Sequence, residues 1–204
     1  MKKVCANWEQ AFPAENWGPS FFDEFEMRAK NASAEVFRVK TAAEAQEALL
    51  TIVKSINAKK VVAVDSPLQQ AAGINAALQS LGIEVYTTRE EIAAHAESAD
   101  LGISGVEFAV AETGSVCQDA YAVESRLVSA LTPIHVAFLP SQNIVRGMEE
   151  ALGVISQVFD RGYISFITGP SRTADIERVL TIGVHGPSRF IIIAIDEQVA
   201  GGAA

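Results

Sequence analysis

Cysteine is scarce in this chain of 204 residues, because only Cys5 and Cys117 occur and neither stands in a CxxC motif or a Cys/His cluster. An iron–sulfur cluster needs four thiolate ligands, so the chain cannot hold one by itself. The same scarcity argues against a structural zinc site and provides no disulfide framework. It fits a reducing compartment, and we expect a cytoplasmic protein.

Long hydrophobic runs are also missing. The longest strictly apolar run covers residues 190–195, whereas a helix that crosses a membrane needs about 20 apolar residues. The N-terminus, MKKVCANWEQ, has two lysines but no apolar segment after them, so it does not match a signal peptide. We therefore expect no membrane span.

Positive charge is in the minority, with 16 Lys and Arg against 25 Asp and Glu and a net charge of −9. Such a chain repels phosphate backbones, and binding to nucleic acid would need a basic stripe. The densest cationic stretch, residues 54–60, has only three lysines and ends a predicted helix, where positive charge favours the helix dipole. We expect no nucleic-acid partner.

Two parts of the chain differ in composition. Residues 1–19 form an aromatic N-terminal arm with Trp8, Phe12 and Trp17, and residues 20–204 have the pattern of a single α/β domain. We expect the arm to cover an apolar surface of its own domain. The alternative is a contact in a homo-oligomer, since Trp and Phe are enriched at interfaces.

Predicted strands alternate with predicted helices from residue 20 onward. The strands are 35–39, 61–64, 85–87, 106–111, 115–118, 134–139, 163–168 and 190–195, and the helices are 20–30, 41–56, 67–81, 90–95, 141–159 and 173–182. Strands that are apolar throughout, separated by amphipathic helices, are typical of a mostly parallel sheet covered on both faces. The sequence therefore predicts an α/β fold.

Four polar loops follow predicted strands, and ligands of open α/β sheets bind beyond the carboxyl ends of the strands. If the sheet is parallel, all four loops lie at one edge. The loops are Asp65-Ser66-Pro67, Glu112-Thr113-Gly114-Ser115, Pro140-Ser141-Gln142-Asn143 and the GPSRTAD segment at 169–175.

The GPSRTAD segment has the residues of a site for a small carboxylate or phosphate. Gly169 permits close approach of the backbone, and Ser171 and Thr173 offer hydroxyls. A helix starting near Thr173 would present free N–H groups, and Arg172 would add a planar fork of donors. The alternative is that Thr173 is only a helix cap and that Arg172 pairs with Asp175.

Glu112 ends an apolar strand beside a glycine turn. Burial would raise the pKa of this carboxyl group and make it a candidate catalytic base or nucleophile. The alternative, which we prefer, is that Glu112 accepts hydrogen bonds from neighbouring N–H groups and organises the turn.

Asp65, Ser141, His185 and Gly186 form a second tier of candidates. His185 and Gly186 lie between the predicted last helix and last strand, at the opposite edge of the sheet, where Gly186 could end the helix. His95 and His135 have no partner at ligand spacing, so we expect no metal site. No GxSxG, GxxxxGK[ST] or GxGxxG motif is present, which argues against serine hydrolases, P-loop NTPases and classical dinucleotide enzymes.

Two segments resemble the motifs of a known family. Residues 102–104 and 109–115, GIS and AVAETGS, resemble the "GIT…AIAETGT" segment of the LUD-domain family, the group that includes lactate-utilisation protein C. Residues 167–177 and 183–187, ITGPSRTADIE and GVHGP, resemble its "ITGPSRTADIE…LGVHGP" signature. The resemblance extends over about residues 20–196 and leaves out the arm.

This resemblance implies a three-layer α/β/α sandwich of the NagB/RpiA/CoA-transferase type. It also implies a role in L-lactate oxidation to pyruvate beside cysteine-rich partner proteins that carry the iron–sulfur clusters, with no cofactor in this chain. It assigns no catalytic residue. The motif marks as candidates Glu112, Thr113, Gly114, Gly169, Pro170, Ser171, Arg172, Thr173, Asp175, His185 and Gly186.

Three functions remain open from the sequence. The first is an accessory subunit for lactate utilisation that binds a small anionic metabolite at the 112–115 and 169–175 loops. The second is an independent acyl-transfer or sugar-phosphate enzyme with Glu112 as nucleophile or base, which rests on fold analogy. The third is a non-catalytic scaffold whose aromatic arm docks onto the cluster-bearing partners.

Overall fold

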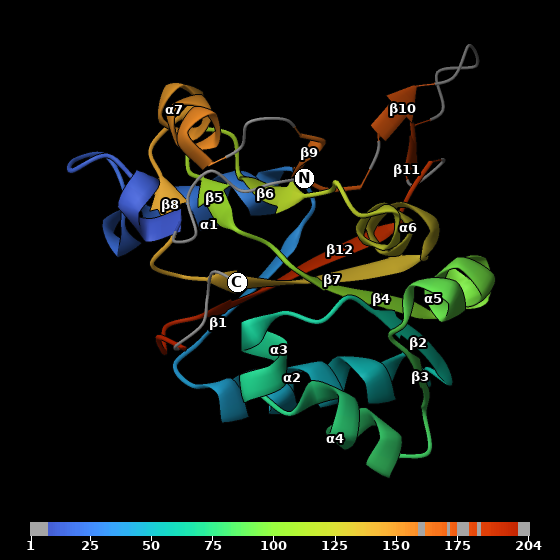
Figure 1. The fold of residues 1–204 in the computed structure, drawn as a ribbon. Helices are drawn as coiled ribbons and strands as arrows, with labels where there is room; N and C mark the ends of the chain where they lie inside the picture. Colours follow the sequence, from blue (N-terminus) through green and yellow to red (C-terminus); the bar gives the residue numbers. More distant parts are fainter. Residues whose placement is uncertain (1–7, 159–161, 171, 175–179, 183–184, 200–204) are drawn as a thin grey trace.

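A six-stranded, all-parallel sheet forms the centre of the protein (Figure 1). The structure is a computed structural model that describes residues 8–158, 162–170, 172–174, 180–182 and 185–199. In spatial order the strands are β1 (Glu35–Val39), β12 (Arg189–Ile195), β7 (Ile134–Pro140), β4 (Leu101–Gly105), β2 (Lys60–Ala63) and β3 (Glu84–Tyr86).

The central strands are mostly apolar because helices or a second sheet cover both faces. In β12, all residues from Phe190 to Ile195 are at most 1% exposed. Ile191 and Ile193 lie in register with Val136 and Phe138 of β7. The prediction of a mostly parallel sheet in an α/β fold is confirmed.

Three helices cover one face of this main sheet: α2 (Ala42–Ser55), α3 (Pro67–Ala71) and α4 (Ile74–Ser80) (Figure 1). Thr41 caps α2 by accepting a hydrogen bond from the backbone N–H of Glu44. The predicted helix 67–81 is divided at Gly73, whose φ of +60° is left-handed, so α3 and α4 are separate helices.

The other face is covered by α1 (Phe22–Asn31), η3 (Ala96–Ser98), α5 (Arg89–His95), α6 (Val123–Leu131) and a second sheet of four strands. In spatial order that sheet contains β8 (Ile144–Val145), β5 (Phe108–Val110), β6 (Ser115–Asp119) and β9 (Ile164–Ile167). It is mixed, since β5 pairs antiparallel with β6 and parallel with β8. The predicted turn at Thr113–Gly114 joins β5 to β6.

The outer face of the small sheet carries α7 (Met148–Val158) and the aromatic segment that follows η1 (Trp8–Ala11), whereas Phe21 of η2 (Pro19–Phe21) packs in the core cluster of α1. Phe12 stacks on Trp17 with ring centroids 4.5 Å apart and meets Phe108 of β5 edge-on at 5.9 Å. The described part of the aromatic arm therefore packs against the chain's own small sheet and α7.

One predicted helix is wrong, and another starts later than predicted. Residues 172–174 and 180–182 form β10 (Arg172–Ala174) and β11 (Leu180–Ile182), an antiparallel pair, where the pattern predicts a helix over 173–182. β-branched residues recur at 173, 176, 179, 181 and 182, and they favour extended backbone. The helix predicted over 141–159 starts only at Met148, because the chain first forms β8. The pattern also does not predict β4 or α6.

The described residues contain no helix that is both long and apolar enough to span a membrane.

Candidate functional site

The four polar loops do not share one edge, so that prediction is wrong. Asp65 and Ser141 follow β2 and β7 and lie at the carboxyl edge of the main sheet. Glu112 and Gly169 follow β5 and β9, which belong to the small mixed sheet. The sequence pattern does not distinguish strands of one parallel sheet from strands of two sheets.

The 112–115 and 168–170 loops do come together within the small sheet. β6 and β9 pair antiparallel with Val116 opposite Ile167, and the hydroxyl oxygens of Ser115 and Thr168 are 2.8 Å apart. Pro170 is buried beside them. Thus two of the predicted loops form one local structure.

Glycine in both loops permits close packing on α1. Gly114 has a φ of +68°, and a Cβ there would lie 2.3 Å from the backbone nitrogen of Ala29. A Cβ on Gly169 would lie 2.4 Å from the carbonyl oxygen of Ala32. The structure therefore gives these glycines a packing role against the end of α1.

The helix that would supply anion-binding N–H groups at Thr173 is absent, because Arg172 and Thr173 belong to β10. This part of the predicted anion site is wrong, and with it the alternative that Thr173 caps a helix. Ser171 and Asp175 lie outside the described residues.

Glu112 is exposed, so the buried carboxyl group that the catalytic alternative requires is not found. Its Oε2 accepts a hydrogen bond of 3.2 Å from the backbone N–H of Met148, at the start of α7. Glu150 accepts from the backbone N–H of Gly147 at 3.1 Å. Both carboxylates thus lie at the positive end of the α7 dipole and stabilise the start of this helix. This agrees with an organising role for Glu112.

An open cleft of roughly 630 Å³ surrounds Glu112. Arg28 of α1 and Arg146, just before α7, line it and are exposed. Among the described residues neither arginine forms an ion pair within 4.0 Å, although Glu24, Glu149 and Glu150 also line the cleft. Sequence reasoning missed both arginines, since no motif surrounds either one.

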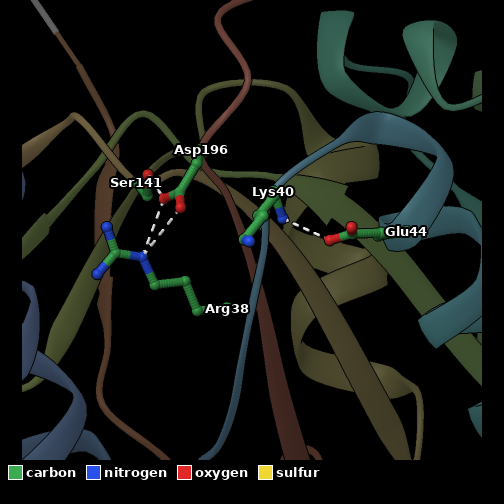
Figure 2. A network of polar contacts seen from close by, with 5 residues as sticks. All are labelled: Arg38, Lys40, Glu44, Ser141 and Asp196. Atoms are coloured by element: carbon green, nitrogen blue, oxygen red, sulfur yellow. Dashed lines mark hydrogen bonds and ion pairs between the residues drawn. The ribbon is translucent and has the colours of Figure 1, made fainter.

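A different polar network occupies the carboxyl edge of the main sheet, and Figure 2 shows it. Asp196, after β12, accepts a hydrogen bond from the Ser141 hydroxyl and another of 2.9 Å from Nε of Arg38. The Arg38 guanidinium lies 4.4 Å from the ring centroid of Phe22. Nearby, the backbone N–H of Lys40 donates to Glu44 at 2.7 Å.

Asp196 is held in its charged form by this network. Desolvation by burial favours the neutral acid, but the hydrogen bonds from Ser141 and Arg38 and the charges of Arg38 and Lys40 outweigh it, so the pKa of Asp196 is lowered. Asp65 lies at the same edge, is exposed and accepts a 2.8 Å hydrogen bond from Asn75. Ser141 is thus a hydrogen-bonded structural residue that precedes β8, whereas the predicted helix 141–159 places it at the start of a helix.

The histidines are dispersed. His185 and Gly186 precede β12 and lie at the amino edge of the main sheet, opposite Ser141, as the pattern predicts; β11 is the preceding element, so Gly186 does not end a helix. His95 stacks on Tyr86, with ring centroids 3.9 Å apart. Within the described ranges, no group of three or more His, Cys, Asp or Glu residues could hold a metal ion.

The chain is an α/β protein with a parallel main sheet and a small mixed sheet. Its candidate site is the polar cleft beside the 112–115 turn. The LUD domain family model matches residues 22–195, and the chain belongs to that family.

Relatives named Lactate utilization protein C are similar over most of the chain. The protein from Halalkalibacterium halodurans is 30% identical over 160 residues, which cover 75% of this chain and 70% of the relative. The protein from Geobacillus kaustophilus is 31% identical over 172 residues, 78% and 71% of the two chains. A crystal structure of a DUF162 family protein from Deinococcus radiodurans has a TM-score of 0.59 and 22% identity, covering 90% of this chain and 99% of that one, which shows a shared fold.

Proposed function

We propose that this chain is a subunit of a lactate-utilisation system and supports L-lactate oxidation to pyruvate beside partner proteins that carry iron–sulfur clusters. Membership of the LUD domain family and the relatives named Lactate utilization protein C support this role. The chain has two cysteines, so in this proposal the electrons pass through clusters on other proteins. We also infer that the fold belongs to the NagB/RpiA/CoA-transferase type.

The small anion of this proposal binds in the cleft beside Glu112. The observation that carries it is that Arg28 and Arg146 both line the cleft and have no ion-pair partner among the described residues. Lactate and pyruvate are carboxylates, which a guanidinium binds through paired N–H donors. The turn at Gly114 packs against the backbone of Arg28, so the ETGS motif helps to position that arginine.

Isothermal titration of the full chain with L-lactate, pyruvate, acyl-CoA and sugar phosphates tests the ligand class. Lactate or pyruvate should saturate a single site, and Arg28→Gln or Arg146→Gln should weaken binding by about 1.5–3 kcal/mol. Arg172→Ala tests, by the same titration, the arginine that the sequence predicts as the anion-binding residue. Arg89→Gln, at an exposed arginine outside the cleft, is the matched control, and equal affinity in all variants would rule out the cleft. Preferred binding of acyl-CoA or a sugar phosphate would favour the independent enzyme instead.

The partner proteins require a separate test. Co-purification from cells that express the chain with cysteine-rich iron–sulfur proteins should recover a complex. If deletion of residues 1–19 abolishes the complex while the shortened chain stays folded, the scaffold role of the aromatic arm is supported. A folded, fully associated shortened chain would contradict that role and leave the anion cleft as the better account.

A further inference from the structure

A second cleft, of roughly 720 Å³, lies where the β6–α6 loop meets the beginnings of α5 and β9. Its lining residues include Arg89, Tyr121, Arg126 and Tyr163, and none of them lines the cleft beside Glu112. The volume is within the range of small-molecule sites. Family membership and the lactate role do not account for this cleft.

Two large aromatic side chains are unusually exposed in it. Tyr121 is 56% exposed and Tyr163 is 57% exposed, and Val123 beside them is 38% exposed. A tyrosine ring is largely apolar, so two tyrosines that stay more than half exposed in one concave surface offer apolar area to a bound molecule. Planar aromatic rings suit such faces best, because they stack on tyrosine.

Arg126 fixes these two tyrosine segments before any ligand binds. Its guanidinium carbon lies 4.7 Å from the centroid of the Tyr163 ring. Its Nη1 donates to the carbonyl oxygens of Ala120 at 2.6 Å and Tyr121 at 3.1 Å. The backbone N–H of Ala120 in turn donates to the carbonyl of Tyr163 at 2.9 Å. A site that is already ordered loses less entropy on binding.

Arg89 supplies an available positive charge at the same cleft. Its side chain is 67% exposed, and its Nε forms an ion pair of 3.9 Å with Glu124, which also lines the cleft. An exposed ion pair of this length is weak and too long for a hydrogen bond. Glu124 lies in the first turn of α6 and offsets part of the positive potential of that helix end. Two arginines, Arg89 and Arg126, and one carboxylate, Glu124, line the cleft, so its lining is net positive in a chain of net charge −9 and favours an anionic group.

We propose that this cleft binds a planar aromatic anion, with the ring against Tyr121 and Tyr163 and the anionic group at Arg89. Nucleoside monophosphates and aromatic carboxylates both have this chemistry. Lactate and pyruvate have no ring, so the site is distinct from the carboxylate cleft beside Glu112.

Titration of the full chain with AMP and, separately, with benzoate tests the proposal by calorimetry. We expect saturable binding of at least one probe, and the probe that saturates identifies the source. Adenosine has the ring without the charge, and inorganic phosphate and acetate have the charge without the ring. Each of these should bind at least about tenfold more weakly than the corresponding complete probe.

Variants then locate the binding. Arg89→Gln removes the positive charge and Tyr121→Leu removes the aromatic ring, so each should weaken binding by about tenfold. Both side chains are exposed, so we expect both variants to fold. Arg28→Gln changes the other cleft and should leave binding of the aromatic probe unchanged, so the two proposals fail independently. The inference is overturned if neither probe saturates below about 5 mM, or if Arg89→Gln and Tyr121→Leu leave the affinity unchanged.

Discussion

Nε2 of His135 lies 2.8 Å from the hydroxyl oxygen of Ser104, between the adjacent strands β7 and β4. Both side chains are at most 1% exposed, and Gln118 of β6 donates a 3.0 Å hydrogen bond to the same hydroxyl. Desolvation by burial lowers the pKa of His135 to about 3, so the imidazole is neutral in the folded protein at ordinary pH.

Stability should therefore fall with acidification. The unfolded state takes up a proton near pH 6.5, whereas folded His135 does not until about pH 3, so stability is lost as the pH falls through this window. The expected loss between pH 7 and pH 5 is about 2 kcal/mol, measured by urea unfolding. His135→Gln should remove this loss, and His95→Gln, at a half-buried surface position, should retain it. Equal pH dependence in the wild type and His135→Gln would contradict the assignment.

Gly114→Ala should severely destabilise the protein. The new methyl group would collide with the backbone of Ala29 at a left-handed φ, so the ETGS turn must move away from α1. We expect a loss of at least about 3 kcal/mol in the free energy of unfolding. Gly153→Ala is the matched control, because it lies in α7 with no atom within 4 Å of the new Cβ, and it should stabilise the protein by up to about 1 kcal/mol. Similar effects at both glycines would count against the packing role.

Glu112→Gln tests the role of the carboxylate at the start of α7. The amide keeps an acceptor for the N–H of Met148 but removes the charge that favours the positive helix end, so we expect a loss of about 1 kcal/mol. Chemical unfolding at neutral pH measures it. Glu149→Gln changes an exposed carboxylate in the first turn of α7 and should lower the free energy of unfolding by less. A Glu112→Gln protein as stable as the wild type would refute the organising role.

Phe12→Ala measures how strongly the aromatic arm contributes to folding. Phe12 is 8% exposed and contacts both Trp17 and Phe108, so the truncated side chain leaves a cavity over the small sheet. We expect a loss of about 3 kcal/mol in thermal or chemical unfolding. Leu152→Ala, at a 56% exposed position of α7, should change stability by about 0.5 kcal/mol or less. An equally small effect of Phe12→Ala would mean that the arm packs weakly.

The main elements of the fold follow from local signals in the sequence. The apolar run that forms β12 and the hydroxyl of Thr41 that caps α2 act through neighbours in the chain, so their pattern predicts them. The segment 173–182 fails because its apolar spacing suits a helix while its β-branched residues suit strands.

The candidate site depends on tertiary structure and is harder to predict. Arg28 and Glu112 line one cleft because Gly114 allows the 112–115 turn to pack closely against α1. The sequence likewise indicates the ETGS turn but not that Glu112 is exposed, since exposure depends on where α7 lies. The sequence pattern thus predicts the ETGS motif, but the contacts around it depend on how the helices pack.

The place of β12 in the main sheet bears on how the protein is made. This strand is synthesised last among the six, yet it lies between β1 and β7 and pairs with both. On the ribosome, β1 therefore has no strand beside it until β12 emerges, and its apolar side chains stay open to wrong associations until then. A nascent chain that stalls before residue 189 should need chaperone protection that the finished chain does not.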